Sequence, residues 1–156
     1  MGNTPRIVTA LTVALLTVAL AVEARAATAN ASIEDHISRG EAQLAEQDID
    51  AAIATFAEAV ATHPNSALAH TRLGGAYLLD RQYTEAIDQF QQAISLDAEN
   101  AGAFIGLGMA YLHGGQTGPA KAALTEAKRL APAKADELDD LIQRIERGGE
   151  QANPHR

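Results

Sequence analysis

Between residues 33 and 147 the apolar positions follow the period of a helix. They recur at intervals of three and four residues, which gathers them on one face of each segment. Breaks containing Gly, Pro and Asn, such as His63-Pro64-Asn65, separate the segments. The pattern predicts seven helices, over about residues 33–46, 50–62, 66–79, 83–96, 100–113, 117–130 and 135–147.

The signals at the helix ends support this division. Ser32 is suited to cap the first helix and Thr84 the fourth, and Pro119 falls in the first turn of the sixth, where proline is tolerated. In the seventh helix one stripe is apolar and the remaining positions are mostly charged. The stripe consists of Leu138, Leu141, Ile142 and Ile145. Because Gly148 and Gly149 follow, we predict that this helix ends at residue 147 and that residues 148–156 form a disordered tail.

The helices repeat in pairs with a period of thirty-four residues. Positions one period apart hold the same residue type in several independent series, and each series lies at helical spacing within its segment. The series are Gly40, Gly74 and Gly108; Ala52, Ala86 and Ala120; Ala59, Ala93 and Ala127; Phe56 and Phe90; Leu73 and Leu107; Tyr77 and Tyr111; and Pro64 and Pro132. Each repeating unit is therefore a pair of helices.

At these positions the sequence resembles the tetratricopeptide-repeat family. The resemblance covers three repeats over residues 33–134, and it implies an all-α fold, a short right-handed solenoid of about seven helices in which the helix at 135–147 covers the open end. The middle repeat keeps six of the eight family positions but has His70 in place of the usual Trp. The first repeat has Arg39 and Gln43 where Leu and Tyr are usual, a loss of apolar positions expected of a terminal repeat.

The resemblance also implies a binding face, because in this family the first helix of each repeat lines a concave surface that holds a segment of another protein. Carried over by register, the peptide-binding residues are Ile37, Glu41, Leu44, Leu68, Thr71, Arg72, Leu78, Ile105, Met109 and Leu112. Gly75 and Gly102 lie on the same face of the first helices. Some relatives grip a C-terminal carboxylate here. The matching positions hold Ile37, Glu41, Arg72, Gly102 and Gly106. Since Arg72 is the one basic residue of this set, that clamp is absent, and the face suits an apolar or amphipathic segment with a basic residue at one end.

Composition narrows the function further. The chain is 47% hydrophobic but only 4% aromatic, which favours closely packed helices. Its net charge of -8 leaves no basic cluster for nucleic acid, and the lack of cysteine excludes disulfides and thiolate zinc sites. The five histidines have no metal-site spacing. Without a catalytic or phosphate-binding motif, we expect no metal, no cofactor and no enzymatic activity.

The first 26 residues have the pattern of a signal peptide. Arg6 precedes an apolar run over residues 7–22, and Ala24-Arg25-Ala26 forms a small-x-small cleavage site. The run is short for a membrane span, which needs about 20 apolar residues. We therefore expect a protein exported to the periplasm or secreted, with no membrane association after cleavage and a linker at residues 27–32; an uncleaved anchor would leave the domain on the same side.

Together these observations predict an exported, non-enzymatic protein–protein interaction module. A self-assembling structural protein is the alternative, in which the concave face or the helix at 135–147 packs against a second copy. A carrier of a small apolar ligand would need a closed cavity instead of an open trough.

We expect the mature protein to start at Ala27, because the small-x-small site directly follows the apolar run. The intact mass of the protein recovered from the exported fraction measures its start. A full-length mass in the membrane pellet would identify an uncleaved anchor instead.

Overall fold

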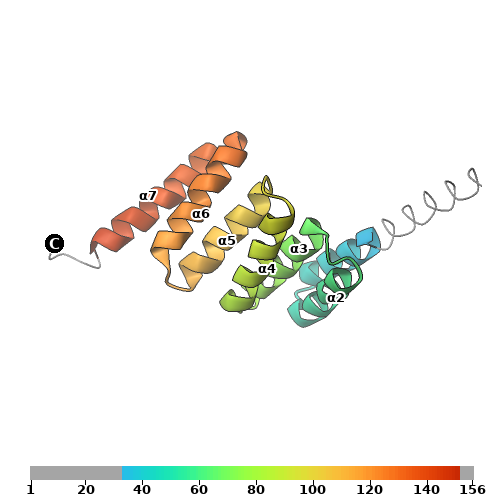
Figure 1. Cartoon of the computed structure of the whole chain (residues 1–156). Helices are drawn as coiled ribbons and strands as arrows, with labels where there is room; N and C mark the ends of the chain where they lie inside the picture. Colours follow the sequence, from blue (N-terminus) through green and yellow to red (C-terminus); the bar gives the residue numbers. More distant parts are fainter. Residues whose placement is uncertain (1–32, 152–156) are drawn as a thin grey trace, which may run out of the picture. The chain divides into compact units, whose positions relative to one another are not determined.

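The computed structural model describes residues 33–151, with side chains described as far as residue 148. Within this range the chain is all-α, as predicted (Figure 1). A helix at residues 33–45 is followed by α2 (Ile49–Thr62), α3 (Ala67–Leu79), α4 (Tyr83–Leu96), α5 (Ala101–His113), α6 (Thr117–Leu130), the short 3-10 turn η1 (Pro132–Lys134) and α7 (Ala135–Gln151). The predicted signal peptide, the linker at 27–32 and residues 152–156 of the predicted tail lie outside the described residues.

Most helix bounds agree with the periodicity, and two local predictions are wrong. The N-cap of α4 is Gln82 and not Thr84, which lies inside the first turn of the helix. The seventh helix does not end at Gly148 and Gly149 but continues to Gln151. Glycine ends a helix where it adopts a positive φ, and the described glycine that does so is Gly115. In other positions glycine only lowers helix stability, by about 1 kcal/mol.

The turns inside the three helix pairs share one backbone conformation. Gln47, Arg81 and Gly115 are spaced by thirty-four residues and all have a positive φ, of 64°, 62° and 76°. In the middle turn the backbone N–H of Gln82 donates to the carbonyl of Tyr77, and that of Arg81 donates to the carbonyl of Leu78. This bonding closes the end of a helix in the Schellman manner. Glycine adopts the conformation easily, so Gln47 and Arg81 hold it at a cost that packing must offset.

Within each pair a small residue on the first helix contacts a large side chain on the second. A methyl group at Gly74 would come within 3.0 Å of the Phe90 ring, and one at Gly108 within 2.6 Å of Leu124. The alanines of the repeat series, among them Ala86 and Ala120, are completely buried. Short side chains at these positions let the paired backbones approach closely, as the sequence predicts.

The two kinds of helix differ in their neighbours. The A helices are the 33–45 helix, α3 and α5, and the B helices are α2, α4 and α6. Successive helices from α2 to α7 pack against one another, and α3 also contacts α5. Among the described helices α4 contacts neither α2 nor α6. The A helices α3 and α5 therefore lie closer together than the B helices do.

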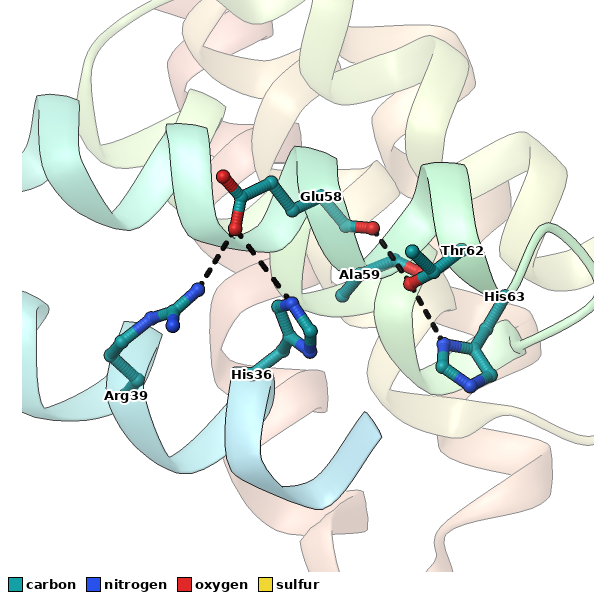
Figure 2. Close-up of polar contacts among 6 residues, drawn as sticks. All are labelled: His36, Arg39, Glu58, Ala59, Thr62 and His63. Atoms are coloured by element: carbon teal, nitrogen blue, oxygen red, sulfur yellow. Dashed lines mark hydrogen bonds and ion pairs between the residues drawn. The ribbon is translucent and has the colours of Figure 1, made fainter. Parts of the chain in front are cut away.

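Polar contacts join the first pair. Figure 2 shows Arg39 and His36 extending from the 33–45 helix toward Glu58 on α2. The Arg39 guanidinium donates to Glu58 Oε2 at 2.9 Å, and His36 Nε2 lies 3.7 Å from the same oxygen. On the next turn of α2 the Thr62 hydroxyl donates to the Glu58 carbonyl at 2.8 Å and lies 2.9 Å from His63 Nδ1. Because the carboxylate is mostly exposed, these contacts add only about 0–1 kcal/mol and serve chiefly to orient the pair.

The last helix covers the third pair. Leu138, Ile142 and Ile145 of α7 are buried in one cluster with Leu124 and Ala127 of α6. Lys128 pairs with Asp139 at 2.7 Å and Lys121 pairs with Glu146, so ion pairs border this apolar contact. Within residues 33–151 no helix is long and apolar enough to cross a membrane.

We expect Ala86→Leu to lower stability by about 1–3 kcal/mol, because the completely buried methyl group leaves no room for a larger side chain. Ala98→Pro is the comparison: residue 98 lies in an exposed turn, one period from Pro64 and Pro132, and the preceding residue Asp97 is already extended. Thermal melting followed by circular dichroism measures both. Equal midpoints for the two variants would contradict the packing described for α4.

Candidate functional site

An open groove of about 360 Å³ lies along the A helices. It is lined from three A helices and one B helix, by Leu44, Thr71, Arg72, Gly75, Leu78, Leu79, Phe90, Gly102, Ile105, Gly106 and Met109. Most of these residues belong to α3 and α5, whose contact forms the base of the groove. The lining is apolar except for Thr71 and Arg72.

Glycines give the groove its depth. A methyl group at Gly106 would lie 2.2 Å from Phe90 Cζ, so the ring from α4 reaches directly beneath the α5 backbone. At Gly75 an added methyl group would meet no atom within 4 Å, and at Gly102 only Asn100 Oδ1, at 3.4 Å. Gly106 therefore makes room for a side chain of the protein itself, whereas the space above Gly75 and Gly102 is open.

Two polar links fix the A helices beside the groove. Asn100 accepts a hydrogen bond from the Ala103 backbone N–H at 2.9 Å and thereby caps α5. Its side-chain amide donates to the Thr71 hydroxyl of α3 at 3.1 Å. On the other side, Arg72 Nε donates to Glu41 Oε1 at 2.7 Å and joins α3 to the 33–45 helix. The charge of Arg72 is thus balanced by a carboxylate of the same surface.

The structure brings together six of the ten side chains predicted for the binding face. Leu44, Thr71, Arg72, Leu78, Ile105 and Met109 line the groove. Glu41 lies at its border through its pair with Arg72. Leu78 and Ile105 are partly buried and also pack against core clusters, so only part of each side chain is available to a ligand.

The other three predicted residues do not line the groove. Ile37 is buried, and Leu68 is exposed but outside the lining. Leu112 packs against the cluster that α6 and α7 form. The register assumed that the three repeats are equivalent, but α7 covers the last one, and Leu112 is partly buried against the cluster that α6 and α7 form and lies outside the lining.

Two lining residues were missed by the sequence reasoning. Phe90 has the position of a core residue and is almost completely buried, yet its ring reaches the floor of the groove because Gly106 has no side chain in its way. Leu79 is the last residue of α3, one position beyond the apolar stripe that ends at Leu78, and it is 58% exposed. The short distance from Gly106 to Phe90 is a tertiary property, and the periodicity carries no signal for it.

Two polar groups outside the groove, His70 and Glu126, have structural partners. His70, in place of the family's Trp, is buried, with its ring nitrogens 2.8 Å from Gln89 Oε1 and 3.0 Å from the Pro64 carbonyl oxygen. A hydrogen bond from Arg129 lowers the pKa of Glu126, but this pair lies on the surface of α6. Within residues 33–148 no cluster of three His, Cys, Asp or Glu side chains is arranged to hold a metal ion.

A row of helix pairs, with an open apolar groove along the A helices and a last helix covering the end, defines a helical-repeat interaction domain. Two family models, both described as tetratricopeptide repeat, match residues 37–101 and 77–145. The chain belongs to the tetratricopeptide-repeat family. No curated protein matches it in sequence.

Solved structures of this family share the fold. The second TPR domain of human RPAP3, in complex with the HSP70 peptide SGPTIEEVD, is 24% identical with a TM-score of 0.70, over 76% of this chain and 98% of that one. The TPR2B domain of yeast Sti1, in a complex with pHsp70, is 20% identical with a TM-score of 0.71, over 75% and 98%. The Yersinia enterocolitica type III secretion chaperone SycD, in complex with a peptide of the translocator YopD, is 16% identical with a TM-score of 0.70, over 76% and 95%.

We expect Gly106→Ala and Gly75→Ala to change stability in opposite directions. The methyl group at residue 106 meets the Phe90 ring and should destabilise by about 1–3 kcal/mol, whereas residue 75 has open space and gains roughly 0.5–1 kcal/mol from better helix propensity. Urea unfolding of both variants measures the difference. Destabilisation of equal size at the two positions would contradict the groove geometry.

Proposed function

We propose that this protein is an exported interaction module that holds an apolar or amphipathic segment of another protein in the groove along its A helices. The observation that supports this most directly is the open apolar lining between α3 and α5, formed on packed helices that need no ligand to complete their core. A row of partly exposed Leu, Ile and Met side chains on rigid helices is the kind of surface that binds such segments.

The size of the groove limits the expected affinity. A volume of about 360 Å³ accommodates a few side chains of a partner. Each buried apolar side chain contributes roughly 1.5–3 kcal/mol, against an association cost of about 4–15 kcal/mol. We therefore expect dissociation constants on the order of micromolar, which suits a chaperone-like or assembly role in which the partner must also be released.

The ligands of similar structures support a peptide-binding role, but they do not define which segment this groove binds. The neighbours from RPAP3 and Sti1 are solved with HSP70 ligands, and the RPAP3 peptide ends in the acidic sequence EEVD. In this chain the basic side chain of the lining is already paired with Glu41. A strongly acidic segment is therefore a poor candidate for this groove.

Export and the absence of enzymatic activity complete the proposal. Export is supported by the signal-peptide pattern of residues 1–26. A binding role without catalysis is supported by the lining itself, which contains no carboxylate, histidine or serine.

The test uses two exposed leucines that occupy the last position of successive helices. Leu79 ends α3 and lines the groove, and Leu96 ends α4 outside it. We expect Leu79→Asp to reduce capture of partners from the exported fraction at least tenfold, because a carboxylate would have to be desolvated in the apolar contact. Capture followed by quantitative mass spectrometry measures the loss.

Leu96→Asp is the matched control, since both leucines are at least 40% exposed and both substitutions place an acid at a helix C-terminus. It should capture as well as the unmodified protein, and both variants should melt alike. Full capture by Leu79→Asp, or equal loss in both variants, would remove the groove from the binding surface.

A further inference from the structure

We propose that the segment bound in this groove carries one bulky aromatic side chain as its anchor, together with basic residues beside it. This inference rests on the proposed function and adds the chemistry of the partner. Three features of the described residues support it: the hollow above the glycines, the Met109 thioether in its wall and the charge of the surrounding repeats.

The hollow is the part of the groove that the protein leaves unfilled. Gly75 on α3 and Gly102 on α5 both line it, and neither position has a heavy atom within 3 Å of where a methyl group would stand. An aliphatic residue at either position would narrow this space. Because the protein has glycine at both, the groove of about 360 Å³ keeps room there for a bulky side chain of the partner.

The wall of the groove favours a ring over an aliphatic chain. Phe90 lies beneath the groove but is only 2% exposed, so its ring supports the floor and offers little surface to a ligand. Met109 stands on the same helix as Gly106, and its thioether makes favourable contacts with aromatic groups. An aromatic anchor would therefore find a favourable sulfur partner in the wall of the groove.

Charge complementarity indicates the flanking residues. Residues 33–99 hold twelve acidic and three basic side chains, whereas residues 100–148 hold six of each. Arg72, the charged residue of the lining, is neutralised by Glu41, and Asp80 directly follows Leu79 at the end of α3. A segment with lysine or arginine beside its anchor gains attraction from these repeats, and an acidic one is repelled.

Synthetic peptides with a central Trp test the anchor. The protein contains no Trp, so the emission of the peptide reports on the peptide alone. We expect a peptide of Leu and Ala with a central Trp and lysines at both ends to bind with a blue-shifted emission. Replacing its Trp by Ala should weaken binding about tenfold or more, measured by calorimetry. Replacing its lysines by glutamates should also weaken binding, and added salt should reduce that difference.

Two variants of the protein test whether the Trp side chain binds in the hollow above Gly75. Gly75→Leu fills the hollow and should remove the preference for Trp over Ala, while Gly118→Leu, at an uncrowded position of α6 outside the groove, should retain it. Circular dichroism checks that both variants remain helical.

The outcomes separate this inference from the proposed function. Equal affinity for the Trp and Ala peptides, tighter binding of the acidic peptide, or no binding of any peptide overturns the aromatic and basic anchor. If Leu79→Asp still blocks capture of natural partners in that case, the groove remains the binding surface with another specificity. A dimer that occupies the groove and is not displaced by the Trp peptide overturns the inference in favour of self-association.

Discussion

In each helix pair a glycine of the A helix lies directly against a large side chain of the B helix, and the rest of the structure depends on this contact. Gly40, Gly74 and Gly108 receive Phe56, Phe90 and Leu124. Any side chain at these glycines would overlap or crowd its partner. The short distance between paired backbones follows, and with it the complete burial of the alanines between the helices, because only small side chains fit there.

Glycines on the A helices also create the groove. Phe90 is close enough to α5 that Gly106 must also be glycine, and the ring then serves as core and floor at once. Glycine at two uncrowded positions, Gly75 and Gly102, has no packing reason of this kind. Each glycine lowers the intrinsic stability of its helix by about 1 kcal/mol. In return the groove stays open above it, because no side chain occupies that space. A loss of helix propensity along the groove fits the proposed role in recognition.

The contacts at the two ends of the array of helix pairs differ. At the N-terminal end the buried contact of Gly40 with Phe56 is joined by exposed contacts of Glu58 with Arg39 and His36, which orient the helices but stabilise them little (Figure 2). At the C-terminal end α7 adds a true apolar cluster around Leu124 and closes the last repeat with ion pairs at its border. Because α7 takes part of the surface of α5, the open groove is centred between α3 and α5.

The sequence by itself determined the all-α class, the thirty-four-residue pairing and nearly every helix boundary, because these depend on periodicity and on local signals such as Pro64 and Pro132. It also identified six of the side chains that line the groove, since register within a repeat fixes which face of a helix they occupy. Only the tertiary structure decided that Leu112 packs against the α6 and α7 cluster outside the groove lining, that Phe90 reaches the groove and that Gln47 and Arg81 adopt the conformation natural to Gly115. Each of these follows from contacts between helices, and such contacts override local preference once the pairs are packed.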